Sequence, residues 1–357
     1  MAAARAAAAA DAAAAAAAGG SEMMNRRKDM KSTPINVRLS ILVCSAGAVA
    51  LLCLLALDAA PQTADKTPAA KKAPAAARVG KAFRTPDEAA DALIDAAEKF
   101  DVTALDEILG PDGKDIINSG EPARDKERAA TFAARAREKK SVEKDPKSAL
   151  RRILTIGNED WPFPVPIVKR TGKWYFDSKA GLQEILYRRV GANELDAIQA
   201  CHIYVEAQHD YALMKKEGGV NQYAQRIIST PGKQDGLAWQ EADGKWGGPL
   251  GENIAKAIAK GYTTKAEPFH GYFFKVLKGQ GPAAPLGQMD FVVKGVMIGG
   301  FALIAAPAQY RVTGVKTFMV SHDGVVYEKD LGPNTPELAK KIELFNPDRT
   351  WSPVKEN

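Results

Sequence analysis

The stretch "NELDAIQACHIYVEAQHDYALMKKEGG", residues 193–219, holds the longest helical pattern of the chain. At about 100° per residue, Ile198, Cys201 and Val205 fall on one side of a helix. Asn193 is a candidate N-cap, and the glycine pair at 218–219 is a stop signal. An apolar stripe of this length needs a partner, so we expect the helix to cover one face of a sheet.

The last hundred residues predict that sheet. Five short stretches alternate or run apolar and are separated by Gly, Pro or Asp, which is typical of an antiparallel meander. The segment 221–248 is broken by Gly and Pro, and we expect it to be irregular and to lie over the sheet. Short helices are expected at 251–261 and 336–345. The expected strands are "GYFFKVL" (271–277), "MDFVVKGV" (289–296), "GGFALIAAP" (299–307), "GVKTFMVS" (314–321) and "VVYEKDL" (325–331).

A second set of elements precedes the long helix. Thr85 predicts a helix N-cap, with Pro86 at the first helical position and Glu88 three residues after the cap. Two more helices are expected at 102–109 and 121–140, then a strand at 148–157 and a separate helix at 180–190.

The stretch "WPFPVPIVKRTGKWYFD", residues 161–177, predicts a hairpin that turns at "RTGK". Prolines 162, 164 and 166 alternate with large apolar residues, so in a strand they share one face and one edge. Because proline has no N–H to donate, we expect an unpaired edge strand.

The N-terminal region predicts export. A basic segment, which includes Arg26, Arg27 and Lys28, precedes the uncharged apolar run 41–57. This order is typical of a signal peptide, and about 17 residues nearly suffice for a membrane span, so a cleaved signal and a retained inner-membrane anchor both remain open. We expect a periplasmic or secreted body. The Ala, Pro and Lys composition of 61–81 indicates an extended spacer.

These patterns predict an α+β protein with two domains, each made of helices and an antiparallel sheet. We place the N-terminal extension with its signal or anchor at 1–60, the linker at 61–81, a cone-like domain at 82–189 and the long helix with its meander at 190–357. With 49 basic and 43 acidic side chains and no basic block, we expect no nucleic-acid binding. Cys201 alone lies in the body, which excludes an intramolecular disulfide there.

Several of these motifs in order resemble the exported bacterial family named domain of unknown function 2950, from about Phe83 to Pro353. They include residues 161–177, "YAQRIISTPGKQDGLAW" (223–239), "HGYFFKVLKGQGPAAP" (270–285) and 313–332. The resemblance implies an exported protein and supplies no activity or catalytic residue. The order of elements in the C-terminal half is also similar to pilin-like globular heads, although here the helix is internal.

His202, Glu206 and His209 form the best candidate metal group, because spacings of four and three place them on one patch of the helix. The alternative is that both histidines pack at the core or its edge and Glu206 is solvated. We expect no metal and no cofactor. The glycine-rich stretches at 247–251 and 279–287 lack the residues of a phosphate loop or a dinucleotide fingerprint.

Two other histidines lie near predicted strands of the C-terminal half. His322 and Asp323 lie in "SHDG" (321–324), which predicts a hairpin loop and not a catalytic pair. His270 precedes a strand, at the rim of a possible site. Tyr262, Phe269, Tyr272 and Phe274 surround it in sequence, where a sugar or peptide could stack, with core packing as the alternative.

We therefore expect an exported, non-catalytic protein of the cell envelope that acts by binding or assembly. Its expected partner is an envelope protein or a peptidoglycan or sugar ligand, with membrane contact only if 41–57 is retained; no oligomeric state is indicated. The alternative is a periplasmic hydrolase or metal-dependent enzyme with its site between the two domains. A histidine and a carboxylate that meet in a pocket would favour the enzyme.

Overall fold

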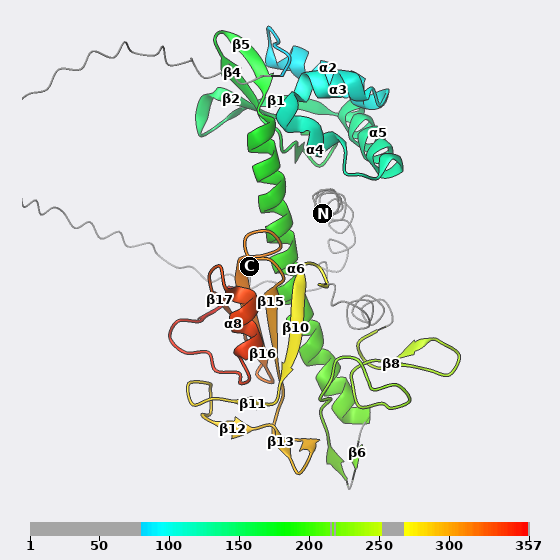
Figure 1. The fold of residues 1–357 in the computed structure, drawn as a ribbon, viewed down its shortest axis with the longest axis vertical. Coiled ribbons are helices and arrows are strands. Elements are labelled where there is room, and N and C mark those ends of the chain that lie inside the picture. The colour runs from blue at the N-terminus through cyan, green and yellow to red at the C-terminus, as the bar shows by residue number, and fades with distance from the viewer. Residues whose placement is uncertain (1–79, 215, 218, 252–267, 356–357) are drawn as a thin grey trace, which may run out of the picture.

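The computed structural model describes residues 80–214, 216–217, 219–251 and 268–355. A single helix, α6 (Ser178–Met214, 37 residues), runs along the molecule and carries one body at each end (Figure 1). Each body combines helices or a helix face with antiparallel strands, so the α+β prediction is confirmed. Buried apolar side chains form two core clusters, one drawn from residues 83–176 and the other from 197–345.

The N-terminal body begins as its local signals predict. The Thr85 side chain accepts a hydrogen bond from the Glu88 backbone N–H, and Pro86 opens the helix. Its sheet has the order β1-β2-β4-β5, with β3 paired to β2 as well. The elements are α2 (Pro86–Glu98), α3 (Val102–Leu109), a 3-10 turn (Pro111–Gly113), α4 (Lys114–Ile117), α5 (Pro122–Glu138), β1 (Lys140–Asp145), β2 (Ser148–Ile156), β3 (Trp161–Pro162), β4 (Ile167–Arg170) and β5 (Lys173–Phe176).

The proline-rich stretch differs from the prediction of one continuous edge strand. It divides into β3 and β4, both paired with β2, and β4 lies between β2 and β5 inside the sheet. Pro164 and Pro166 are buried in the bend between the two strands, together with Val165. The missing donors of these prolines are accommodated because the bend makes no ladder there. The predicted turn is confirmed, with positive φ at Thr171 and Gly172.

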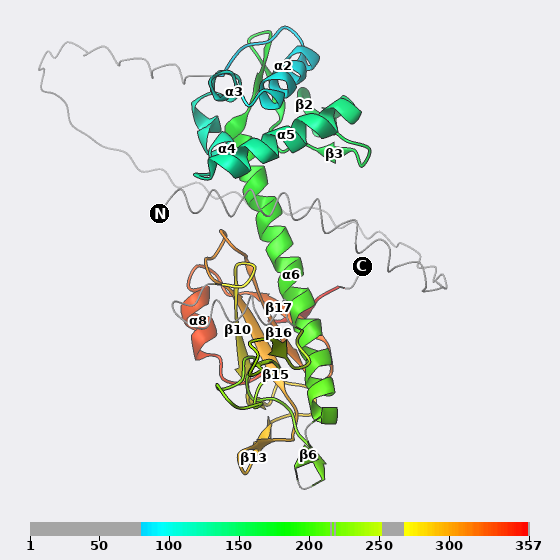
Figure 2. The same ribbon diagram turned by 90° about the vertical axis from the view of Figure 1, so that its right-hand side faces the viewer.

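The C-terminal body is the predicted meander packed on the long helix. The sheet order is β10-β15-β16-β17-β18, and the sheet lies between α6 and α8 (Figure 2). The predicted strand at 289–296 is broken into short pairs, because Lys294 and Gly295 take positive φ and turn the chain. The main elements are β10 (Tyr272–Leu277), β15 (Ala302–Pro307), β16 (Lys316–Ser321), β17 (Val326–Asp330), α8 (Thr335–Lys341) and β18 (Ser352–Pro353).

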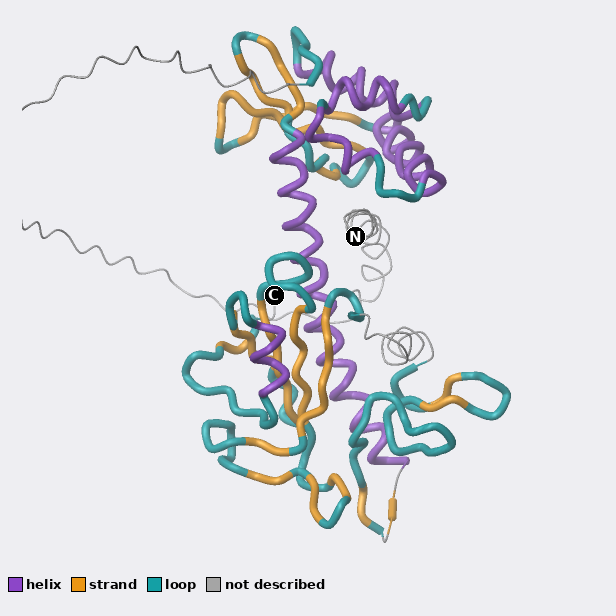
Figure 3. Tube along the Cα trace, viewed as in Figure 1, coloured by secondary structure: helices purple, strands orange, loops and turns teal. Residues whose placement is uncertain are grey.

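Short hairpins surround this sheet, as Figure 3 shows in the lower body. The segment 221–248 contains only β7, β8 and β9 and is otherwise irregular, as predicted. It also supplies buried side chains to the second core, including Leu237 and Trp239. The hairpin strands are β6 (Lys216–Glu217), β7 (Val220–Asn221), β8 (Trp239–Gln240), β9 (Trp246–Gly247), β11 (Gly279–Gln280), β12 (Met289–Asp290), β13 (Val292–Val293) and β14 (Val296–Met297).

The prediction that Asn193 caps a new helix is wrong, because α6 continues through it from Ser178. The Asn193 side chain instead donates to the Thr313 carbonyl, 2.8 Å away. The Glu194 carboxylate accepts from the backbone N–H groups of Val315 and Lys316. These polar side chains fasten the helix to the end of the sheet, and the helix therefore crosses the predicted boundary at 189/190 without a break.

The buried face of α6 also differs from the predicted stripe. It is rotated by about a quarter of a turn: Ile198 and Val205 of the predicted stripe are only half-buried, whereas Tyr204 and Gln208, which lie outside it, are buried. This face of the helix is buried because its small and aromatic side chains pack against both the sheet and the segment 221–250. They include Ala197, Tyr204 and Tyr211.

The predicted signal or anchor at 41–57 and nearly all of the predicted helix at 251–261 lie outside the described residues. Within the part of the chain that the structure describes, no helix combines the length and apolar character needed to cross a membrane.

Candidate functional site

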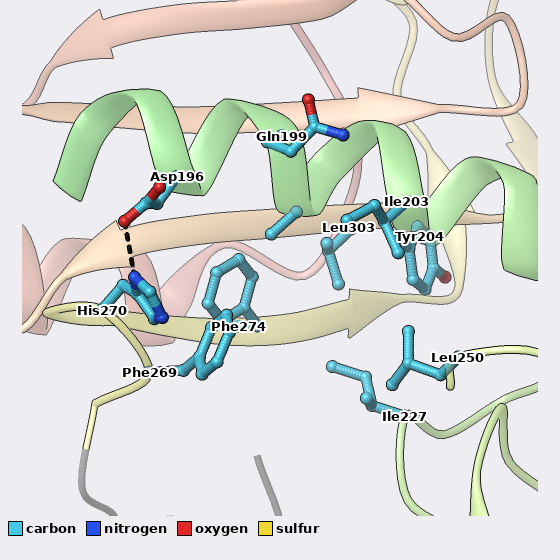
Figure 4. Close-up of a pocket in the computed structure, with 11 residues that line it drawn as sticks. Asp196, Gln199, Ile203, Tyr204, Ile227, Leu250, Phe269, His270, Phe274 and Leu303 are labelled. Carbon is cyan, nitrogen blue, oxygen red and sulfur yellow. Dashed lines mark hydrogen bonds and ion pairs between the residues drawn. The ribbon is translucent and has the colours of Figure 1, made fainter. Parts of the chain in front are cut away.

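A cavity of about 200 Å³ opens between α6, β10 and β15. Most of its lining is apolar and comes from segments far apart in the chain (Figure 4). Helix α6 contributes Ile203 and Tyr204, and β15 contributes Leu303. The irregular segment contributes Ile227 and Leu250 to the same end.

The opposite end of the cavity is aromatic and polar. Phe269 and Phe274 stand side by side there, with ring centroids 6.2 Å apart. His270 and Asp196 lie next to them at the mouth (Figure 4). The predicted aromatic group is thus divided: Phe269 and Phe274 line the cavity, Tyr272 is 1% exposed in the core, and Tyr262 is outside the described residues.

A tight turn presents His270. Both His270 and Gly271 have positive φ, 46° and 76°, and the Tyr272 N–H donates to the Phe269 carbonyl at 2.9 Å. Positive φ at both central residues is the pattern of a type I′ turn, which favours Gly and Asn. A histidine in this conformation is strained, and such strain concentrates at functional positions.

His270 is bound to the helix by Asp196. The distance from Nδ1 to the carboxylate Oδ2 is 2.5 Å. Since an ionised carboxylate only accepts hydrogen bonds, Nδ1 carries the proton and donates it. This hydrogen bond raises the pKa of His270 above its ordinary 6.5, against the opposing effect of partial burial. The other ring nitrogen, Nε2, lies on the side facing Phe269 and Phe274 (Figure 4).

The chemistry of the pair depends on the charge of the ring. The protonated imidazole offers Nε2–H as a donor beside the cavity, and the neutral ring offers a lone pair there. No serine, threonine or cysteine is among the described residues that line the cavity, so a neutral His270 would have water as the nucleophile to activate.

A buried hydrogen-bond network lies beside the aliphatic end of the cavity. Tyr204 donates to the Ala302 carbonyl, and the buried Gln208 side chain donates to Tyr204 Oη at 2.9 Å. The Gln208 amide also exchanges two hydrogen bonds of 2.8 Å with the backbone of Ala224. Burial raises the pKa of Tyr204. This network ties α6 to the segment that supplies Ile227 and Leu250.

The candidate metal group at His202, Glu206 and His209 is not assembled by the structure. His202 is half-buried, whereas Glu206 and His209 are exposed. The His209 ring meets the edge of Phe301, with centroids 5.6 Å apart. Across the described ranges, no three His, Cys, Asp or Glu side chains come together as a metal would require.

The residues His322 and Asp323 occupy the predicted turn between β16 and β17. The Asp323 carboxylate accepts from Ser321 Oγ and from the Val325 N–H, so it serves the turn. The imidazole of His322 packs edge-on against Phe291, with centroids 5.9 Å apart. The two side chains therefore have separate structural roles.

Reasoning from sequence missed Asp196 as the partner of His270. The two residues are 74 positions apart, and only the packing of α6 on the sheet brings them together. The available signal was the His-Gly dipeptide before a strand, since Gly in that place indicates a turn.

The comparisons with known proteins bear on the family alone. No curated protein and no solved structure matches the chain. The model of a family described as protein of unknown function (DUF2950) matches residues 80–354, which include both bodies and every residue of the cavity. The chain therefore belongs to the DUF2950 family.

Proposed function

We propose that the protein is a non-catalytic binding protein of the cell envelope, and that it takes an apolar group of its partner into the cavity between α6, β10 and β15. The cavity itself supports this proposal: its walls are mostly apolar and come from four segments, and His270 and Asp196 form a hydrogen-bonded polar pair at one end. Ligand sites in proteins commonly combine apolar walls with a few polar groups that orient the ligand.

The walls also favour one of the two expected partner classes. Burying sugar hydroxyls without hydrogen-bond partners costs free energy, and side chains such as Ile203, Leu303 and Leu250 offer none. An apolar side chain of an envelope protein is the better match, and a peptidoglycan or sugar ligand the poorer one.

The envelope location rests on the sequence. A basic segment followed by the apolar run 41–57 supports export, and the spacer at 61–81 would separate the folded bodies from a membrane. Alkaline phosphatase fused after Pro353 tests it, because this reporter folds actively only outside the cytoplasm. We expect activity in intact cells; an inactive fusion retained in the cytosol would contradict the location.

A second candidate function is supported by the hydrogen bond between His270 and Asp196, because a histidine and a carboxylate that meet in a pocket are what an enzyme would require. A carboxylate that orients a histidine is the usual partner of a general base, so the protein would be a periplasmic hydrolase that activates water. This activity requires the neutral ring and rises with pH through the pKa of His270, which its contact with Asp196 raises. All the described residues that line the cavity belong to the C-terminal body, so this site does not lie between the two bodies.

Filling the cavity tests the binding function. Ala200 lines it, and Ala200→Phe places a ring inside the space. The matched control is Ala242→Phe, because Ala242 is exposed next to β8 in the same body. We expect toluene binding, followed by ligand-observed NMR, to be lost in Ala200→Phe and kept in the control. Equal binding by both variants would show that toluene occupies another place.

A further inference from the structure

We propose that the group bound in this cavity is a single aromatic ring that carries a hydrogen-bond acceptor, and that the acceptor receives a hydrogen bond from His270 Nε2. This inference rests on the proposed binding function and adds the chemical class of the ligand. The size of the cavity, the arrangement of its walls and the orientation of His270 support it in turn.

The size of the cavity fits one ring. Its volume is about 200 Å³. An apolar protein cavity of about 150 Å³ binds benzene, and sites for drug-sized ligands begin at about 300 Å³. The available space is therefore that of a ring with one small substituent, or of one aromatic side chain.

The walls change in character along the cavity. One end is aliphatic, with Ile227, Leu250 and Leu303, whereas Phe269 and Phe274 line the other end beside His270 (Figure 4). The two phenylalanine rings are inclined by 58° to each other. Aromatic rings favour such tilted contacts by about 0.5–1.5 kcal/mol beyond the burial of their area.

His270 places a hydrogen-bond donor beside the phenylalanine rings when its ring is protonated. Asp196 occupies Nδ1, so the second N–H of the protonated ring, at Nε2, lies on the side of the phenylalanine rings. The charges of Asp196 and the protonated ring offset each other, so a neutral carbonyl or hydroxyl acceptor matches the site without burying a net charge. The hydrogen bond to Asp196 keeps the ring in this place.

Two probes of nearly equal shape distinguish the contribution of the aromatic ring to binding from that of the hydrogen-bond acceptor. Acetophenone has a carbonyl oxygen where α-methylstyrene has a methylene group. The variant His270→Asn removes the imidazole and keeps the turn, because Asn tolerates positive φ. The dissociation constants of both probes for the wild-type chain and the variant form a double cycle, which isolates the hydrogen bond from the difference in water solubility.

We expect His270→Asn to weaken acetophenone binding about tenfold, the loss of one hydrogen bond, and to change α-methylstyrene binding less than about twofold. Equal weakening of the binding of both probes would rule out the hydrogen bond from His270 to the acceptor, but it would leave the proposed binding function in place. Failure of both probes to bind the wild-type chain would overturn the binding function itself. N-acetylphenylalaninamide is a third probe. If it binds more tightly than acetophenone, the natural ligand is an aromatic side chain of a polypeptide; if it binds more weakly, the natural ligand is a free aromatic compound.

Discussion

Replacement of Gln208 by methionine is expected to destabilise the body that holds the cavity. Gln208 is fully buried, and its amide makes three hydrogen bonds, two of them with the backbone of Ala224. Methionine keeps the length of the side chain but leaves the Ala224 N–H and C=O without partners. Each stranded buried group costs about 1–3 kcal/mol, so we expect a loss of about 4 kcal/mol.

Hydrogen exchange followed by mass spectrometry measures this loss locally. A loss of about 4 kcal/mol corresponds to about a thousandfold lower protection in peptides that cover 200–212 and 222–240. Peptides from 150–176 belong to the other core and are expected to remain unchanged. The control Gln183→Met alters an exposed residue of the same helix and is expected to stay within about 0.5 kcal/mol. A loss below about 1 kcal/mol in Gln208→Met would show that the Gln208 hydrogen bonds do not stabilise this body to the expected extent.

Two glycines of α6 are expected to respond in opposite ways to alanine, measured by thermal unfolding. A Cβ at Gly181 would lie 2.6 Å from Val165 Cγ2, so we expect Gly181→Ala to destabilise the protein by about 1–3 kcal/mol. A Cβ at Gly191 would meet nothing within 4 Å, so we expect Gly191→Ala to stabilise it by up to about 1 kcal/mol. The ring of His270 is expected to titrate above 6.5 in NMR, and Asp196→Asn to lower that pKa. Because the folded pKa is raised, the contact stabilises fully below about pH 6.5 and loses its contribution, up to about 1 kcal/mol for a half-exposed pair, as pH rises through the folded value. Stability that increased over this range would contradict the assignment.

Elements with local signals could be predicted closely from the sequence. The Thr85 cap, the end of α3 at Gly110 and the turn at Gly172 depend on residues within a few positions of one another. The meander followed from alternation, and its order β10-β15-β16-β17-β18 is that of neighbouring strands joined in sequence, apart from the short hairpins.

Features that depend on distant partners could not be predicted. Asparagine is a common N-cap residue, but the Asn193 amide donates a hydrogen bond to the Thr313 carbonyl and the helix continues through this position. The stripe of α6 was misplaced because the segment 221–250 covers a side of the helix that looked polar, including Gln208. The cavity joins Asp196 to His270 through packing, and residue type gives no sign that His270 takes a positive φ.

The position of a bound aromatic ring decides whether the cavity is the binding site. Methyl groups of Ile203, Ile227, Leu250 and Leu303 line the cavity and can be labelled with carbon-13. With saturating acetophenone, we predict nuclear Overhauser effects between its ring protons and these methyls. If the effects reach only exposed residues such as Leu195 or Leu213 and none of the cavity methyls, the ring does not bind in the cavity.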